Sequence, residues 1–350
     1  MNTSTNNASP GPSVSPFPID LVYLWVDDSD PEWLAKKNAA LAAIGKPVNS
    51  SDLQNRFESK GELQFALRSV QNFLPWINHV YIITNNQIPS WLNTDNPRVS
   101  IVDHRDIIPA EYLPAFNSEA IQLFAHRIPG LSEHFILSSD DMFVGSPLKP
   151  DFFFNASGDP IVIVQEHWYP ENLFSTDTRQ SAGPYRLFDV MLKNAIRLAF
   201  DLSGQRCYFY MCHVLVPFRK SHFEDIFARH GAKIIPNTTT TFREEKNIER
   251  FFYPLYNHVL GRTDLRAEWR LGTTLIPLSA GASWLGMKWR AVLKRLPFWT
   301  RFNYVDVTEK IFDTVSRFQP ALFNVNTSGV FAENIADMEK LFPQKSEFEK

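Results

Sequence analysis

The chain has 350 residues, of which 44% are hydrophobic and 21% charged, as in a soluble globular protein of one large domain or two. A formal net charge of −3 excludes the basic footprint of a nucleic-acid-binding protein, so we expect no nucleic acid as a partner. Aromatic residues make up 14%; they fit an ordinary core, and a sugar-binding or membrane-adjacent surface is the alternative.

The N-terminal segment 1–18 is rich in Asn, Ser and Pro and lacks the charged and apolar regions of a signal peptide. We therefore expect a disordered tail. The longest uncharged stretch, 271–287, contains proline, glycine and hydroxyl residues and is too short and polar for a membrane-spanning helix. Cys207 and Cys212 lack zinc or disulfide spacing, which favours free thiols and a cytoplasmic location.

An α/β core is predicted over residues 19–165. Apolar runs of strand character alternate there with helical patterns, and the runs lie at 19–26, 79–84, 99–102, 134–139 and 161–164. Such alternation predicts a Rossmann-like fold with a largely parallel sheet flanked by helices.

Three helix starts can be assigned from capping residues in this core. Asp30 is expected to cap a helix that has Pro31 at its first position. Ser59 and Glu62 have the spacing of a capping box before an amphipathic run, and Ser118 is expected to cap the helix that follows.

The rest of the chain has a more helical pattern. Amphipathic stretches at 184–200, 221–230 and 246–262 predict a helical part over 166–270. Segment 271–305 has no acidic residue and interleaves lysine and arginine with tryptophan and phenylalanine. It favours contact with an anionic membrane surface, or else a basic lobe that binds an anionic acceptor or packs. Segment 306–350 is expected to form a helical C-terminal portion.

Asp140 and Asp141 stand directly after the apolar run HFILSS. Carboxylates at the end of a strand lie where open α/β sheets bind ligands, and an adjacent pair can hold a hard divalent ion together with substrate phosphates. A solvated Asp-Asp turn that closes the strand is the alternative.

Four segments together resemble the Stealth family of sugar-phosphate transferases, which includes bacterial capsule-polymer enzymes and the lysosomal N-acetylglucosamine-1-phosphotransferase. They are IDLVYLWVDDSDPEW, the long stretch 56–154, HVLVPFRKSHFEDIF with TTFREEKNIERFFYPLYNHV, and PALFNVNTSG with MEKLFPQKSEFE. The family moves a hexose 1-phosphate from a nucleotide diphosphate sugar to a hydroxyl of a glycan acceptor. The resemblance thus implies a UDP-linked donor, a glycan acceptor and Mg²⁺ or Mn²⁺ as cofactor in capsule or cell-surface polysaccharide synthesis. It also implies a glycosyltransferase A-like fold in which the core 19–165 binds the nucleotide sugar, the part 166–270 binds the acceptor and carries catalytic residues, and segment 306–350 completes the active site. For segment 271–305 it implies peripheral contact with the inner membrane or the capsule synthesis machinery.

The resemblance also implies catalytic residues. Asp140 and Asp141, with Asn326 as a further oxygen ligand, are expected to coordinate the ion and the pyrophosphate, although one aspartate could instead take the acceptor proton. His213 is expected to be the general base, because imidazole titrates near working pH. Arg243 is expected to bind a phosphate through its planar fork.

Further substrate contacts are expected from the ends of the strands and the start of the second block. Arg56 is a second phosphate-binding candidate, with a helix-packing ion pair as its alternative. Trp25, Val26 and Asp27 at the end of the first strand are expected to contact base and ribose, with core burial as the alternative for Trp25. Sugar hydroxyls are expected to be bound by Asn85, or by Asn117 and Ser118. The alternative for these residues is a role in turns and helix caps.

Two positions depart from the family pattern: Asn247 and Thr327 stand where acidic residues are common. A metal-dependent glycosyltransferase that releases UDP, and an inactive glycan-binding scaffold of a capsule synthesis complex, therefore remain alternative functions. A homo-oligomer is compatible with the sequence.

Overall fold

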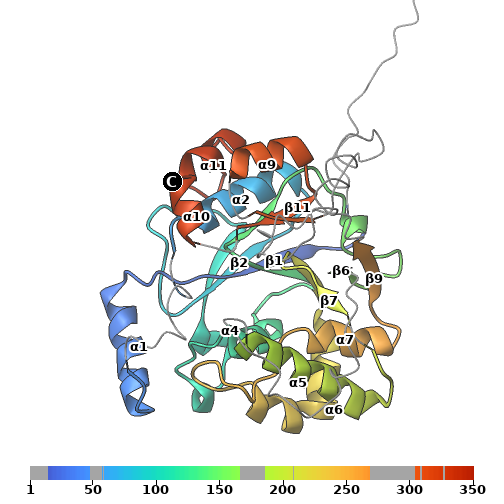
Figure 1. The fold of residues 1–350 in the computed structure, drawn as a ribbon. Coiled ribbons are helices and arrows are strands. Elements are labelled where there is room, and N and C mark those ends of the chain that lie inside the picture. Colours follow the sequence, from blue (N-terminus) through green and yellow to red (C-terminus); the bar gives the residue numbers. More distant parts are fainter. Residues whose placement is uncertain are drawn as a thin grey trace, which may run out of the picture.

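A computed structural model describes residues 15–47, 57, 59–165, 186–207, 209–268, 304–307, 310–325 and 328–350. It shows a mixed α/β fold with a mostly parallel central sheet and a helical C-terminal part, consistent with a glycosyltransferase A-like fold (Figure 1). The predicted fold class is confirmed. Segment 271–303 and most of the N-terminal tail lie outside the described residues, so the predictions made for them are not examined by the structure.

The central sheet has the strand order β3-β2-β1-β4-β8. Its strands are β1 (Ile19–Leu24), β2 (Val80–Thr84), β3 (Val99–Asp103), β4 (His134–Ser139) and β8 (Val216–Arg219). The first four run parallel, and β8 runs antiparallel to β4. Because β8 runs the other way, its first residues lie beside the carboxyl end of β4, where Leu137 pairs with Val216.

Helices cover both faces of this sheet (Figure 1). One face carries α2 (Glu62–Phe73), α9 (Ile311–Phe318), α10 (Ser328–Glu333) and α11 (Ile335–Leu341). The other carries α4 (Ser118–Leu123), α5 (Arg186–Ser203), α6 (Lys220–Ile234) and α7 (Phe252–Val259). A short helix, α3 (His104–Ile107), follows β3 directly.

Two small sheets flank the central one. In the first, β5 (Met142–Val144) pairs antiparallel with β11 (Leu322–Asn324), which pairs in turn with β10 (Tyr304–Asp306). In the second, β6 (Ile161–Gln165) lies between β7 (Tyr210–Met211) and β9 (Asp264–Glu268). The first sheet brings the chain near its C-terminal end against the segment that follows Asp140 and Asp141.

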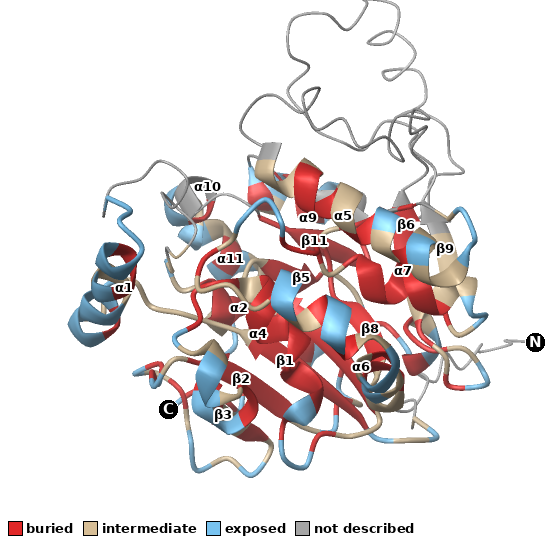
Figure 2. Ribbon diagram, turned by 90° about the horizontal axis from the view of Figure 1, so that it is seen from below, coloured by how far each residue is buried: buried red, intermediate tan, exposed pale blue. Residues whose placement is uncertain are grey.

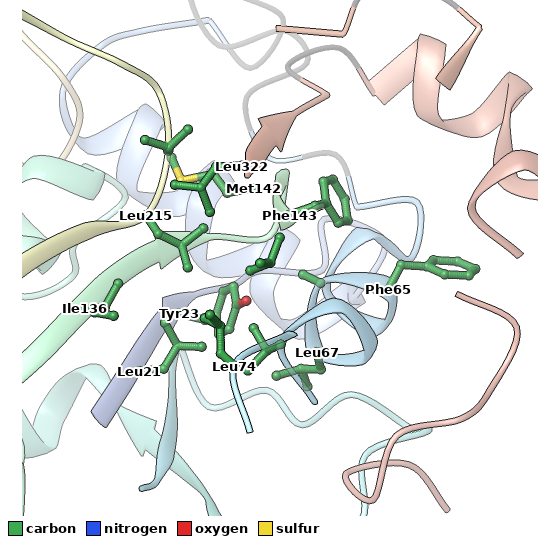
Figure 3. Packing of buried hydrophobic residues seen from close by; sticks show 14 of the residues in the cluster. Leu21, Tyr23, Phe65, Leu67, Leu74, Ile136, Met142, Phe143, Leu215 and Leu322 are labelled. Atoms are coloured by element: carbon green, nitrogen blue, oxygen red, sulfur yellow. The ribbon is translucent and has the colours of Figure 1, made fainter. Parts of the chain in front are cut away.

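Strand periodicity divides the core into two hydrophobic clusters, one on each face. In β1, Leu21 and Tyr23 point toward the cluster beneath α2, whereas Val22 points toward the cluster beneath α4 to α7. Figure 3 shows the first cluster, where Leu21 and Tyr23 meet Leu67 of α2 and Phe143 of β5. Alternate residues of a strand face opposite sides, so the near-continuous apolar runs predicted as buried parallel strands are confirmed.

Helix α1 (Pro31–Ala43) stands apart from the main body (Figure 1) and is exposed along most of its length (Figure 2). Only Trp33, Ala40 and Leu41 are buried; they pack with Phe116 and Phe242. The predicted cap is confirmed, since the Asp30 carboxylate accepts a hydrogen bond from the backbone N–H of Glu32 at 2.8 Å.

The other two predicted caps are wrong. Helix α2 begins after Gly61, which lies in the left-handed region at φ 99°, and Ser59 accepts instead from the Trp25 indole N–H at 3.3 Å. Helix α4 is capped by Asn117, whose side chain accepts from the N–H of Glu119 at 3.1 Å, and Ser118 is its first residue. In both cases the tertiary contacts of the serine hydroxyl override its local capping propensity.

Helix α7 is shorter than its sequence pattern. The amphipathic stretch 246–262 predicts a helix from its first residue, but α7 begins only at Phe252. The preceding residues 238–251 form a loop that is tied to the start of α4, where Phe116 N–H donates to Thr241 O at 2.7 Å. No helix in the described residues is long and apolar enough to span a membrane.

Candidate active site

Several of the predicted site residues lie at the carboxyl ends of β1 and β4. In the order β3-β2-β1-β4, strands progress outward in opposite directions from the neighbours β1 and β4, and open α/β sheets bind ligands at such a switch point. Asp140 and Asp141 follow β4 directly, and Trp25 to Asp27 follow β1. The topology thus places the aspartate pair beside the predicted nucleotide-binding loop.

His213 and Asp141 form the centre of the site. The Nε2 atom of His213 lies 3.6 Å from Oδ2 of Asp141, close enough for electrostatic interaction. His213 reaches this place because it precedes β8, whose start lies beside the end of β4. The neighbouring Cys212 fixes the approach, since its N–H donates to Ile163 O at 3.0 Å.

Burial raises the pKa of Asp141 and lowers the pKa of His213. The pKa of Asp141 rises to about 6 because burial penalises the charged carboxylate, against which the charge of Arg250 acts. The pKa of His213 falls to about 3 because of burial and the charges of Arg250 and Arg243. Both side chains keep an opening to solvent, being 20% and 38% exposed. At neutral pH the pair is therefore a carboxylate next to a neutral imidazole.

The carboxyl groups of Asp140 and Glu62 also lie near Asp141. The pKa of Asp140 is raised well above its ordinary value by burial and by the charges of Asp141 and Glu62, and that of Glu62 is raised mainly by burial. Glu62 is 4% exposed and accepts from the N–H of Lys60 at 2.6 Å. The sequence assigned Glu62 to a cap, but its place on the buried face of an amphipathic helix was a signal of another role.

The aspartate pair has the chemistry of a cation site. Within the described residues, the buried Oδ1 atom of Asp141 has no hydrogen-bond partner, and like charges on Asp140, Asp141 and Glu62 oppose one another. No group of three described His, Cys, Asp or Glu side chains is arranged to enclose a metal ion. Two carboxylates are nevertheless enough for Mg²⁺, which keeps waters and takes its other ligands from substrate phosphates.

Arg243 lies in the loop before α7 and is held by the start of α4. Its Nη2 atom is 3.2 Å from Oε1 of Glu119 and donates a hydrogen bond to Oγ of Ser118. The side chain remains 32% exposed, so one edge of the guanidinium stays open to a ligand. Ser118, predicted to bind sugar hydroxyls, thus positions Arg243.

Arg250 and Glu249 belong to the site although the sequence did not single them out. The Nε atom of Arg250 is 3.7 Å from Oε1 of Glu249, and its backbone N–H donates to Glu119 at 2.9 Å. Both side chains are largely buried, at 14% and 5% exposure. Their adjacency in the block that supplies Arg243 was the available signal.

Asn117 and Asn247 hold the loop rather than face the site. Both are fully buried, and the Asn117 amide donates to Asn247 Oδ1 at 3.1 Å. The same Oδ1 accepts from Glu244 N–H at 2.7 Å, while Asn247 Nδ2 donates to Asn237 O at 3.2 Å. For Asn117 the capping alternative, not the sugar contact, is what the geometry supports. Asn247 serves as a structural amide that needs both its donor and its acceptor.

The loop after β1 is fixed by the loop after β2. Gln87, 4% exposed, accepts from Asp27 N–H at 3.1 Å and donates to Asp27 O at 2.8 Å. The Asp27 carboxylate accepts from Ser29 N–H at 2.9 Å, and Val26 packs partly buried against the cluster around Trp33. Trp25 is partly buried against the main core, and Asn85 is only partly exposed at the rim.

Two predicted site residues, Arg56 and Asn326, lie outside the described residues, as does Thr327. Val325, the residue before Asn326, lies beside the aspartate pair, because its N–H donates to the backbone O of Asp141 at 3.0 Å. Pairing of β11 with β5 thus brings this part of the chain to the aspartate pair, as expected for a segment that completes the site.

Comparison with known proteins agrees with this geometry. Residues 17–45 match the model for Stealth protein conserved region 1, and residues 56–162 match that for conserved region 2. The chain is 36% identical to the capsular polysaccharide phosphotransferase fcs1 of Haemophilus influenzae over 258 residues, covering 73% of this chain and 69% of the relative. It is 35% identical to the capsular polysaccharide phosphotransferase LcbA of Neisseria meningitidis over 254 residues, covering 71% and 67%.

A third relative extends the comparison. The exopolysaccharide phosphotransferase cps2G of Lactiplantibacillus plantarum is 36% identical over 233 residues, which cover 61% of this chain and 68% of the relative. The matched residues include β1, β2, β4 and the aspartate pair. The resemblance seen in the sequence is therefore confirmed: this chain belongs to the Stealth family of phosphotransferases and is an enzyme.

Proposed function

We propose that this enzyme transfers a hexose 1-phosphate from a UDP-linked sugar to a hydroxyl of a capsule or cell-surface glycan. The observation that carries the proposal is the Asp141–His213 pair, 3.6 Å apart, beside two arginines at the switch point of the sheet. The names of its relatives, capsular and exopolysaccharide phosphotransferases, support phosphate transfer in polysaccharide synthesis. The donor, its base and the acceptor are the proposed part.

The reaction forms one bond and breaks one bond at phosphorus. The acceptor oxygen attacks the phosphorus next to the sugar, and the bond from that phosphorus to the bridging oxygen breaks. UMP leaves with the electron pair, and the acceptor proton passes to a base of the enzyme. Positioning and neutralisation of charge supply most of the catalysis in phosphoryl transfer.

The residues of the site match those needs. Asp140 and Asp141 would hold Mg²⁺ or Mn²⁺, which neutralises pyrophosphate charge when it is bound. Arg243, held in place by Ser118 and Glu119, presents its open edge to an anion. The loop of Trp25 to Asp27 lies at the end of β1, where the ribose and base would fit.

His213 is the proposed base for the acceptor proton. Its pKa of about 3 keeps the imidazole neutral and able to accept a proton at neutral pH. In the absence of donor it is a weak base, because burial and two arginines oppose its protonated form. The negative pyrophosphate counteracts those arginines, so donor binding raises the pKa of His213 toward a useful range. Replacement of His213 by Ala should nearly abolish turnover.

The released nucleotide tests this function directly. The protein is incubated with Mg²⁺, a panel of UDP-sugars and a capsule-type oligosaccharide, and the nucleotide is identified by chromatography. UMP is the expected product. UDP would establish glycosyl transfer instead, and no release from any nucleotide sugar would favour the inactive scaffold. His213→Ala serves as the matched control for contaminating activity.

The cytoplasm, with peripheral contact to the inner membrane, is the proposed location. Cys207 and Cys212 form no disulfide with each other, which supports a reducing compartment. The membrane contact is assigned to segment 271–305 from its sequence alone. Sedimentation with anionic lipid vesicles checks it: a chain with the lysines and arginines of this segment replaced by glutamine should lose binding, and undiminished binding would exclude the segment.

A further inference from the structure

A buried charge cluster of four side chains adjoins the Asp141–His213 pair. We define the charge cluster as Glu119 of α4 together with Arg243, Glu249 and Arg250 of the loop before α7. Three of its side chains are at most 14% exposed, and only Arg243 reaches 32%. Glu119 contacts both arginines of the cluster. Its Oε1 is 3.2 Å from Arg243 Nη2, and its Oε2 accepts from the backbone N–H of Arg250 at 2.9 Å.

The charges of this cluster are unevenly compensated. Arg243 is paired with the Glu119 carboxylate. The pKa of Glu249 is raised, first by burial and then by the charge of Glu119, so its charged form is disfavoured. Glu249 is therefore a weak counterion for Arg250.

Arg250 is the less fully paired of the two arginines. The contact of its Nε atom with Glu249 Oε1, at 3.7 Å, is longer than a hydrogen bond. Within the described part of the chain, this buried Nε has no hydrogen-bond partner. A buried guanidinium without full compensation is costly, so its presence at this place favours a role with an anionic ligand.

Arg250 lies close enough to the reacting groups for its charge to act on both Asp141 and His213. A guanidinium at that range would be near the donor pyrophosphate. Arg243 acts on His213 as well, but its Nη2 atom is already engaged by Ser118 and Glu119. Arg250 therefore has more unused hydrogen-bonding capacity than Arg243.

The backbone around Arg250 is held from both sides. Glu249 N–H donates to Met191 O of α5 at 3.3 Å, and the Glu249 carboxylate accepts from Phe251 N–H at 2.7 Å. Helix α7 starts directly afterwards, at Phe252. The backbone at Arg250 is thus fixed before a ligand arrives, which lowers the entropy lost on binding.

We propose that Arg250 is a phosphate-binding residue of the donor site, whose guanidinium binds the pyrophosphate of the nucleotide sugar alongside Arg243. This role rests on the proposed transfer of a sugar phosphate. It assigns Arg250 to substrate binding and Glu119 to the positioning of both arginines.

Binding of inorganic pyrophosphate tests the role without reference to the base or sugar of the donor. The affinity of the full chain is measured by calorimetry in the presence of Mg²⁺. Arg250→Gln should weaken it about 10- to 100-fold, because hydrogen bonds to a charged group are lost. Arg250→Lys, which keeps the charge but not the planar fork, should weaken it less, by about 3- to 10-fold.

Arg262→Gln is the matched control. Arg262 follows the far end of α7 and is a partly buried arginine paired with Asp225 at 2.6 Å; its loss should leave pyrophosphate affinity within twofold of wild type. Thermal melting confirms that each variant is folded. Should Arg250→Gln fail to fold, Arg250→Lys decides, and wild-type affinity in that variant would overturn the role.

The outcomes separate this role from the proposed function. A wild-type enzyme that releases UMP, together with a folded Arg250→Gln variant of unchanged pyrophosphate affinity, would overturn the role of Arg250 and leave the function intact. A wild-type enzyme that neither binds pyrophosphate nor releases a nucleoside monophosphate would contradict the function and this role with it.

Discussion

Two buried ionic groups of this enzyme differ in how completely their atoms are paired. Arg68 of α2 donates to both carboxylate oxygens of Glu349 at 2.7 Å and to Phe342 O at 3.1 Å. Glu349 also accepts from Ser346 N–H at 2.8 Å and from the Gln64 amide. In the active site, by contrast, Asp141 keeps an oxygen without a hydrogen-bond partner among the described residues. The paired group joins two parts of the chain, whereas the unpaired one is open to a ligand.

The pKa values show the same difference. Burial would raise the pKa of Glu349, but hydrogen bonds from Arg68, Ser346 and Gln64 lower it to about 2. Burial dominates at Asp141 and raises its pKa to about 6. A carboxyl group with a lowered pKa stabilises the fold when it is ionised. A carboxyl group with a raised pKa destabilises the fold when it is ionised, and such groups are frequent at functional sites.

Asp141→Asn should have the largest effect on activity and little effect on stability. The amide keeps the shape of the side chain but removes the charge expected to bind the ion, so turnover should fall on the order of 10³-fold. The melting temperature should stay the same or rise, because a desolvated charge next to Asp140 is removed. Steady-state kinetics measures the turnover, and calorimetry measures the melting temperature. Asp201→Asn, at an exposed position on α5, is the control, and an active Asp141→Asn enzyme would remove this carboxylate from the mechanism.

Glu349→Gln should have the opposite profile. Removing one partner leaves the buried Arg68 charge without its counterion, which should lower the free energy of unfolding by about 2–3 kcal/mol. Activity per folded molecule should be unchanged, because no hydrogen bond or ion pair among the described residues joins Arg68 or Glu349 to the aspartates. Urea denaturation measures the free energy of unfolding, and kinetics at low temperature measures the activity per folded molecule. The exposed pair of Arg98 with Glu347, 2.6 Å apart, supplies the control Glu347→Gln, which should cost well under 1 kcal/mol. Equal losses in the two variants would contradict the comparison.

Acid should affect the two groups in separate pH ranges. Stability contributed by Glu349 is present above the ordinary carboxyl pKa and is lost only as the pH falls toward about 2. Asp141 has a raised pKa, so it takes up a proton as the pH falls through about 6, and this uptake favours the folded state. Metal affinity should therefore decrease below pH 6 while the fold remains intact, by about tenfold per pH unit once one proton competes. Mn²⁺ binding followed by electron paramagnetic resonance measures the decrease; constant affinity between pH 7 and pH 5 would exclude Asp141 as a ligand.

Asn247→Asp should have the smallest effect. It introduces the acidic residue common in the family, but it replaces the Nδ2 donor to Asn237 O with an oxygen. Three donors to Oδ1, from Asn117, Thr240 and Glu244, are kept. We expect a loss of about 1–2 kcal/mol in unfolding free energy and no gain in metal affinity. Asn194→Asp, at another loop-binding amide, is a control for stability. A tighter Mn²⁺ site in Asn247→Asp would show that this position faces the metal after all.

Periodicity and capping chemistry made much of the fold predictable. The apolar runs at 19–26 and 134–139 are parallel strands because a strand buried on both faces must be apolar throughout. Asp30 with Pro31 fixed the start of α1 by local chemistry. Local chemistry failed at Ser59 and Ser118, where each hydroxyl bonds to a distant side chain, and at 246–251, where an amphipathic pattern forms a loop tied to α4.

For the active site, the sequence by itself determined that Asp140 and Asp141 end a buried strand and, through its family motifs, that His213 and Arg243 belong with them. It offered only weak signals for Glu62, on the buried face of an amphipathic helix, and for Arg250, in the block that supplies Arg243. It could not show that the charges of both act on Asp141. The tertiary structure alone decided this. The antiparallel β8 brings His213 to the end of β4, and the loop before α7 is held against α4 by buried hydrogen bonds between residues more than 100 positions apart. Contacts at that separation depend on chain topology and burial, which no local pattern encodes.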